Sequence, residues 1–168
     1  MNTLLNEAKK YKDLNEYAEK NQIVVFGDRY LANFPFYDLM QGKITDYAVY
    51  NRSLNLLTLK DAANVVEYCL YHLSPNSVLL HFENATQDET FRENYYSLIE
   101  KIRSVNKKCR IGLLERTPQT GRAIESIARI TKCEYIPVPE DADEKFVFRK
   151  MDAFFRAGRI SFGDAFSI

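Results

Sequence analysis

The sequence predicts an α/β fold in which a parallel sheet is covered by helices on both faces. Short apolar segments alternate along the chain with segments whose apolar residues recur every three or four positions, which is the spacing of an amphipathic helix. The short segments are continuous apolar runs, as at 22–27 and 77–82, rather than an alternation of apolar and polar residues. Strands buried on both faces have this pattern and form parallel sheets between two helix layers.

Five segments have the composition of strands. They are QIVVFG at 22–27, DYAVYN at 46–51, SVLLHF at 77–82, RIGLLE at 110–115 and CEYIPV at 133–138. Five parallel strands in a chain of 168 residues favour an open, flavodoxin-like three-layer sandwich with the strand order 2-1-3-4-5 over a barrel. In such a sheet the ligand crevice lies where the strand order reverses, at the carboxyl ends of the first and third strands.

Helical spacing predicts the segments around these strands. Helices are expected at 1–20, in part of 30–40, and at 59–73, 91–105, 118–130 and 144–157. Pro35 interrupts the second of them, Thr58 and Asp61 form a capping box for the third, and Pro75 ends it. No structure is assigned to the tail 158–168. The length favours one domain over 1–168, with the helix at 1–20 packed on it.

Charge and cysteine content exclude several classes of partner. The chain has 23 basic and 23 acidic residues, so no net field attracts nucleic acid or an anionic membrane. The first twenty residues lack the apolar core of a signal peptide, and no apolar run approaches the roughly 18 residues of a membrane span. Three scattered cysteines, Cys69, Cys109 and Cys133, indicate reduced, mostly buried thiols and a cytoplasmic protein.

Cofactor and metal motifs do not occur in the sequence. There is no glycine-rich phosphate loop, and no cluster of histidine, cysteine and carboxylate residues has the spacing of metal ligands. We therefore expect neither a cofactor nor a metal site. The crevice is instead expected to be lined by the polar residues that directly follow the first three strands, namely Asp28, Arg29, Arg52, Ser53, Glu83 and Asn84.

Three of these segments resemble the sequence blocks of the SGNH, or GDSL, hydrolases. IVVFGDRY resembles the first block, an apolar strand followed by Gly-Asp-Ser, and VYNRSL resembles the second, commonly Asn-Arg-Gly. VLLHFENA resembles the third, with Asn84 at the asparagine of the family's Gly-x-Asn-Asp. The resemblance covers about residues 20–140. It implies the five-stranded parallel sandwich and a relationship to enzymes that hydrolyse acyl esters.

The sequence departs from the family at the residues that carry the catalysis. Arg29 stands at the position of the nucleophilic serine, and Ser53 replaces the glycine whose N–H group contributes to the oxyanion hole. The last family block is Asp-x-x-His; its nearest counterpart here runs from Asp152 to Phe155, and no histidine follows His81. A guanidinium is no nucleophile at any relevant pH, and loss of a triad nucleophile costs about 10⁶ in turnover. The resemblance therefore implies a protein without ordinary esterase activity.

Two interpretations of the crevice remain open. In one, Arg29 and the former oxyanion donors (the N–H groups of Arg29 and Ser53 and the amide of Asn84) bind a small anionic or acylated ligand. In the other, a buried Arg29–Glu83 ion pair fills an unused pocket. In both, Asp28 braces the turn after the first strand through hydrogen bonds.

The neighbouring residues have simpler expected roles. Arg52 is predicted to be a solvated loop residue, His81 a hydrogen-bonded buried imidazole and His72 an exposed side chain. An active hydrolase that uses Ser53 with His81 as its base, acting for example on a carbohydrate O-acetyl group, is an alternative function. A partner-binding or homo-oligomeric protein that uses the aromatic segment 30–40 is another.

Overall fold

The computed structural model describes residues 2–166, with the side chains described from residue 3 to residue 158. Five parallel strands form one sheet in the order β2-β1-β3-β4-β5, which confirms the predicted architecture. The strands are β1 (Ile23–Gly27), β2 (Val49–Asn51), β3 (Ser77–His81), β4 (Arg110–Glu115) and β5 (Glu134–Pro137). Their register pairs Gly27 with His81, so β1 and β3 end side by side.

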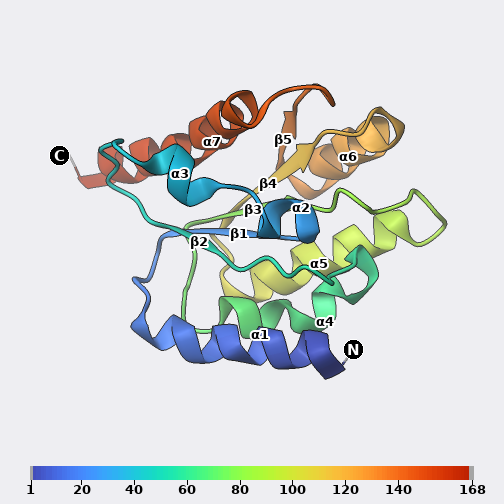
Figure 1. The fold of residues 1–168 in the computed structure, drawn as a ribbon, viewed down its shortest axis with the longest axis horizontal. Coiled ribbons are helices and arrows are strands. Elements are labelled where there is room, and N and C mark those ends of the chain that lie inside the picture. Colours follow the sequence, from blue (N-terminus) through green and yellow to red (C-terminus); the bar gives the residue numbers. More distant parts are fainter. Residues whose placement is uncertain (1, 167–168) are drawn as a thin grey trace.

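Helices cover both faces of the sheet (Figure 1). They are α1 (Asn2–Leu14), the short 3-10 helix η1 (Asn15–Tyr17), α2 (Arg29–Ala32), α3 (Phe36–Met40), α4 (Leu59–Leu70), α5 (Phe91–Val105), α6 (Pro118–Thr131) and α7 (Glu144–Phe166). The buried side chains of α4, α5 and α6 pack on one face, and α1 packs on α4. The buried side chains of α2, α3 and α7 pack on the other face.

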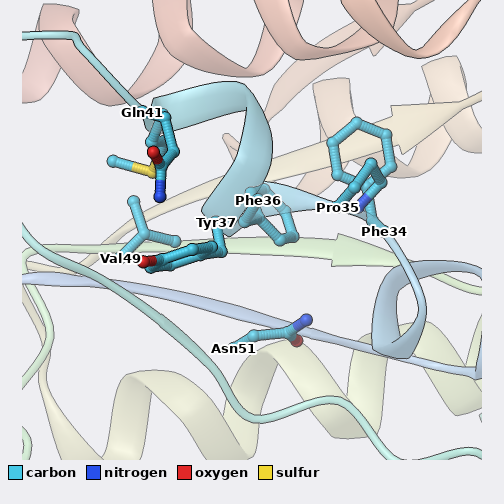
Figure 2. Close-up of a pocket in the computed structure, with 8 residues that line it drawn as sticks. Phe34, Pro35, Phe36, Tyr37, Gln41, Val49 and Asn51 are labelled. Carbon is cyan, nitrogen blue, oxygen red and sulfur yellow. The ribbon is translucent and has the colours of Figure 1, made fainter.

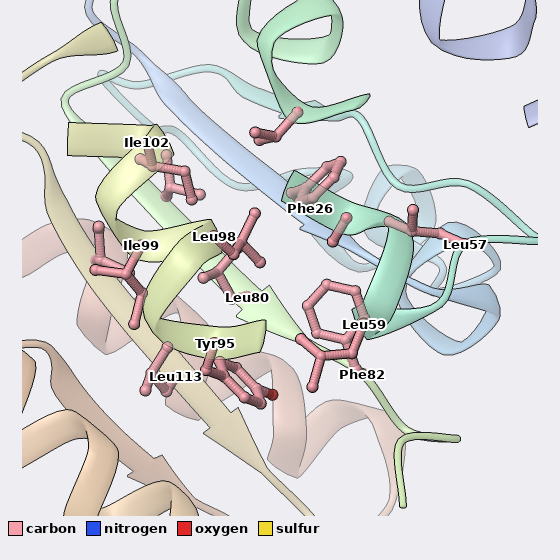
Figure 3. Packing of buried hydrophobic residues seen from close by; sticks show 14 of the residues in the cluster. Phe26, Leu57, Leu59, Leu80, Phe82, Tyr95, Leu98, Ile99, Ile102 and Leu113 are labelled. Atoms are coloured by element: carbon pink, nitrogen blue, oxygen red, sulfur yellow. The ribbon is translucent and has the colours of Figure 1, made fainter. Parts of the chain in front are cut away.

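Alternate residues of each central strand enter the two cores. Phe26, Leu80 and Leu113 belong to one core cluster with Leu98 and Ile102 of α5, and Figure 3 shows Leu80 beside Leu98 and Leu113 beside Tyr95. Val25 and Leu79, one position along, belong to the core beneath α7. All five residues of β1 and of β3 are buried. This burial explains why these strands appear in the sequence as continuous apolar runs.

All five predicted strands are present, but the bounds of several elements differ. The second strand is only Val49–Asn51, against the predicted 46–51, and three helices differ by three residues or more. The N-terminal helix ends at Leu14 and passes into η1, so it is shorter than the predicted 1–20. Helix α4 starts as predicted, with Thr58 accepting a hydrogen bond from the N–H of Asp61. It ends at Leu70, so it is shorter than the predicted 59–73. Helix α7 runs past the predicted end at 157 to Phe166. Residues 167–168 of the unassigned tail lie outside the described residues.

The described residues include three cysteines, none of which is in a disulfide bond. Cys69, Cys109 and Cys133 are free thiols; the first two are buried and the third is half-buried. Burial raises the pKa of Cys69 and of Cys109 to about 12, so neither forms a thiolate near neutral pH. Across 2–166, no helix combines the length and the hydropathy that a bilayer-spanning segment needs.

Candidate functional site

A pocket of about 310 Å³ lies at the carboxyl ends of β1 and β3, where the strand order reverses. Its walls include Arg29 and Tyr30 of α2, Glu83 and Asn84 of the loop after β3, and Glu144 at the start of α7. Three of the six predicted site residues therefore meet in one place. The remaining three, Asp28, Arg52 and Ser53, do not line this pocket.

Asp28 holds the frame of the pocket together. Its side chain is 2% exposed. One carboxylate oxygen, Oδ1, accepts from the N–H of Tyr30 at 3.3 Å and thereby caps α2, while Oδ2 accepts from the N–H of Asn84 at 3.0 Å. The loops after β1 and β3 are thus tied by one buried carboxylate. This confirms the bracing role expected for Asp28.

The side chain of Arg29 is exposed and has no hydrogen-bond or ion-pair partner within residues 3–158. The predicted ion pair between Arg29 and Glu83 is therefore wrong. The physical reason is position: Arg29 begins α2 at the rim of the pocket, where water already solvates its charge, and Glu83 is held by other groups. A partner-free guanidinium beside a pocket is a donor available to a ligand.

Arg116, directly after β4, takes the place that was expected for Arg29. Its Nη1 donates to Glu83 Oε1 at 3.0 Å, and its Nη2 donates to the carbonyl oxygen of Glu140 at 3.1 Å. The guanidinium also lies 4.2 Å from the centroid of the Tyr30 ring, a favourable cation–π geometry. Arg116 is only 13% exposed. Glu83, which lines the pocket, is thus paired with Arg116, which does not.

His81 completes this cluster and has no free ring nitrogen. Nδ1 lies 2.9 Å from the carbonyl oxygen of Leu114, and Nε2 lies against Glu83 Oε2. The backbone carbonyl oxygen and the carboxylate therefore occupy both ring nitrogens of His81. Neither ring nitrogen is free to take a proton from a nucleophile in the pocket. The expected buried, hydrogen-bonded imidazole is confirmed, and His72 is exposed as expected.

Electrostatics keep Glu83 ionised and Tyr30 protonated. Burial alone raises the pKa of Glu83, but the hydrogen bond from His81 and the positive charges of His81 and Arg116 outweigh it and lower that pKa. Burial raises the pKa of Tyr30 to about 12 against the opposing charge of Arg116. Tyr30 is therefore no phenolate nucleophile at neutral pH. The pocket therefore contains charges, but none of His81, Glu83 and Tyr30 is set up for acyl transfer.

Arg52 and Ser53 follow β2 beside the end of β1, but they do not line this pocket. Arg52 is buried; its Nε donates to Asn15 Oδ1 at 2.8 Å, and its guanidinium lies over the rings of Tyr11 and Tyr50. The prediction of a solvated loop residue was wrong, because α1 and η1 close over the end of β2 and supply the aromatic and amide partners. This placement also removes Arg52 from the candidate ligand residues.

The Ser53–His81 arrangement of the alternative hydrolase is likewise wrong. The Oγ atom of Ser53 is buried without a hydrogen-bond partner in the part of the chain described here. Both ring nitrogens of His81 are bonded elsewhere. The N–H group of Ser53 donates to Asn51 Oδ1 at 3.1 Å, so it is not available as an oxyanion donor.

The predicted counterpart of the last family block is also misplaced. Asp152 bonds to the Tyr47 hydroxyl and to Arg156 Nε, and Phe155 is fully buried in the core beneath α7. Both lie inside α7, away from the pocket lining. The segment that reaches the carboxyl edge directly follows β5. It runs from 138 to 144 and brings Glu144 to the pocket, with Asp141 three residues before it.

A second pocket of about 560 Å³ lies beside the first, against α3 and the edge strand β2. Figure 2 shows Tyr37 and Val49 side by side at one part of it and Phe34 with Pro35 at another. Phe34 also lines the first pocket, so the two cavities share a wall. Within the described residues, no group of three histidine, cysteine or carboxylate side chains could hold a metal ion.

Comparison with solved structures identifies the architecture. No family model and no curated protein matches the sequence. A GDSL-like lipase from Bacteroides thetaiotaomicron superposes with a TM-score of 0.58 over 77% of this chain and 77% of the lipase, at 14% identity. The psychrotrophic esterase EstA from Pseudoalteromonas gives 0.58 over 71% of this chain and 78% of the esterase, at 17% identity. The chain has the SGNH hydrolase fold.

A third solved structure extends this likeness. A Streptococcus pneumonia protein named for platelet activating factor superposes on the SGNH-fold chain with a TM-score of 0.66 at 16% identity, over 81% of this chain and 75% of its own. At such identities the likeness concerns the fold.

Three residues of the site were not singled out from the sequence. Arg116 directly follows the fourth strand, so the rule that selected Arg29 and Glu83 also applies to it. Tyr30 follows Arg29 and packs its ring edge-on against His81 at 5.4 Å between centroids. Glu144 follows a six-residue connection, 138–143, whose path no sequence pattern indicates.

Proposed function

We propose that this SGNH-fold chain binds a small anionic or acylated ligand at the carboxyl edge of its sheet and does not hydrolyse it. The observation that carries the proposal is the exposed, partner-free guanidinium of Arg29 on the wall of a pocket of about 310 Å³. Pockets that hold small ligands begin at about this size. A carboxylate or phosphate accepts two parallel hydrogen bonds from a guanidinium.

The chemistry of the surrounding groups supports binding without turnover. Arg29 stands where the family has its serine, and both ring nitrogens of His81 are already bonded. Tyr30 keeps its proton at neutral pH. Hydrolysis of an ester needs a nucleophile, a base and oxyanion donors together, and the described residues that line the pocket include no serine, cysteine or histidine.

The charges of the pocket also favour an anion. Both carboxylate oxygens of Glu83 already have partners, Arg116 and His81, so Glu83 does not compete for Arg29. Glu144 lines the same pocket and is exposed, which leaves its charge screened by water. We keep the cytoplasm as the proposed compartment, in agreement with the free thiols of Cys69, Cys109 and Cys133.

The test is a titration of the whole chain with acetate, inorganic phosphate and octanoate, followed by amide NMR shifts at Tyr30 and Asn84. We expect saturable shifts with at least one of these anions and a loss of affinity of about tenfold or more in Arg29→Ala. Arg129→Ala, an exposed arginine on α6, is the matched control. Equal affinity in the parent and in Arg29→Ala overturns the proposal.

An activity measurement on the same samples separates the alternative functions. We expect hydrolysis of 4-nitrophenyl acetate at the background rate. Turnover clearly above background would instead support a hydrolase with a different residue set, for instance one acting on carbohydrate O-acetyl groups. Absence of any anion binding together with a stable complex or dimer on gel filtration would support a partner-binding protein.

A further inference from the structure

The groove beside α3 differs in character from the pocket at Arg29. Its lining includes Phe34, Pro35, Tyr37, Met40 and Val49, and no charged side chain belongs to it. Its volume of about 560 Å³ lies within the range of small-molecule sites. Tyr37 is 79% exposed at its edge, so a large aromatic surface is left in contact with water there.

Phe34 joins this groove to the pocket at Arg29. It lines both cavities, and its ring lies 5.9 Å from the ring of Tyr30 on one side and 4.8 Å from the ring of Phe36 on the other, centroid to centroid. The series of rings forms a continuous apolar wall. One end of this wall carries the free guanidinium of Arg29, and the other end is uncharged.

We propose that the groove holds the apolar tail of an anion whose head binds Arg29. The inference rests on the proposed function and names its ligand class: a free, single-chain amphipathic carboxylate. Charge complementarity fixes the orientation, because a carboxylate in the uncharged groove would lose its hydration without gaining a counter-ion. An alkyl tail in the groove removes apolar surface of both the tail and Tyr37 from water.

Chain length is the variable that tests the subsite. Acetate, butyrate, hexanoate and octanoate share one head group and differ only in methylenes, and all are used below their micellar concentrations. Full burial strengthens binding about fourfold for each methylene. For a half-open groove we expect about twofold or more per methylene, and shifts at Tyr37 and Val49 that acetate does not produce. Octanol should bind weakly, since it lacks the charged head.

Two groove variants locate the tail. Tyr37→Ser and Met40→Gln should each weaken octanoate about threefold or more and leave acetate unchanged. Tyr17→Ser removes a tyrosine that is 89% exposed outside the groove and should change neither ligand. Circular dichroism and thermal unfolding check that each variant is folded.

The outcomes of the two proposals are distinguishable. If acetate binding depends on Arg29 but affinity does not rise with chain length, the tail subsite is wrong and the proposed function stands. If no anion binds, the proposed function itself is wrong. If the affinity still rises with chain length in both groove variants, the tail does not bind in this groove. If the chain forms a concentration-dependent dimer that Tyr37→Ser dissociates and octanoate does not, the groove is a dimer interface and the proposal is also wrong.

Discussion

Arg116 donates a hydrogen bond of 3.0 Å to Glu83, joining the residue after β4 to the loop after β3. Glu83 also contacts His81, so one carboxylate lies between a guanidinium and an imidazole. The cluster is largely withdrawn from water, since the side chains of His81, Arg116 and Glu83 are 2%, 13% and 28% exposed. In this position the carboxylate contributes to stability, and its contribution depends on pH.

The first prediction concerns that pH dependence. The pKa of Glu83 is lower in the folded chain than its ordinary value of 4.5. As the pH falls, the unfolded chain therefore takes up the proton first, and the stabilisation present above that value is lost as the pH passes through the folded pKa. We expect Glu83→Gln to cost about 2 kcal/mol at pH 7. The difference from the parent should shrink between about pH 5 and pH 3.

Urea unfolding at a series of pH values measures this effect. Glu125→Gln, at an exposed position on α6, is the control and should give a small difference that does not vary with pH in this window. A constant gap between the parent and Glu83→Gln at every pH would contradict the assignment.

Asp28 gives a second prediction, on the frame of the pocket. Asp28→Ala leaves the N–H groups of Tyr30 and Asn84 without their acceptors. Loss of a helix cap and of a charge-assisted buried hydrogen bond should together cost roughly 2–4 kcal/mol. Thermal and urea unfolding check this, with the exposed Asp13→Ala expected to stay within about 0.5 kcal/mol of the parent. Comparable effects of the two substitutions would argue against the brace.

Gly27 and Gly121 form a third, paired prediction. A Cβ atom on Gly27 would lie 2.0 Å from the carbonyl oxygen of His81 and 2.8 Å from Leu31 Cδ1. Gly27→Ala should therefore cost about 3 kcal/mol, because the two backbones cannot separate without breaking the sheet. A Cβ on Gly121, in α6, meets nothing closer than 3.6 Å, so Gly121→Ala should stabilise the chain by about 0.5–1 kcal/mol. Equilibrium unfolding of both variants decides the signs.

The fourth prediction tests whether the pocket keeps the geometry of a hydrolase. Arg29 and Glu144 line the same pocket, and Asp141 lies three residues before Glu144, the spacing of the family's Asp-x-x-His block. Arg29→Ser combined with Glu144→His should therefore raise hydrolysis of 4-nitrophenyl acetate about tenfold over the parent. Arg29→Ser alone should not, because it still lacks a base.

The size of that gain is limited by the oxyanion donors. The N–H group of Ser53 is bonded to Asn51, so it cannot stabilise the developing charge as a free donor would. Matched activity of the double variant and of Arg29→Ser would show that Glu144 does not occupy the position of the base.

The fold could be predicted because its signals are local. Apolar runs and helical spacing depend on residues a few positions apart, and they placed α5 and β4 at their observed bounds. The end of α7 was missed because "GRI" after Ala157 contains a glycine, which favours a helix end. The order of the strands followed from the general rules of parallel sheets.

The site was less predictable because its contacts connect distant segments. The partner of Glu83 is Arg116, 33 positions away, and the burial of Arg52 depends on Asn15, 37 positions away. Knowing that β3 and β4 are neighbours would have favoured Arg116 as the partner of Glu83. No comparable rule predicts that η1 covers Arg52, because the spacing of apolar residues predicts helices and strands but not the path of the segments that connect them.

Asp28 fixes the shape of the pocket rim through main-chain groups and not through the side chains that face a ligand. The two loops of the rim are held by main-chain N–H groups, and every residue type except proline has such a group. The outward side chains at positions 29 and 84 are therefore not needed for the rim to keep its shape. Substitution there changes the chemistry offered to a ligand at little cost to folding, so the rim can present different functional groups while the turn itself is unchanged.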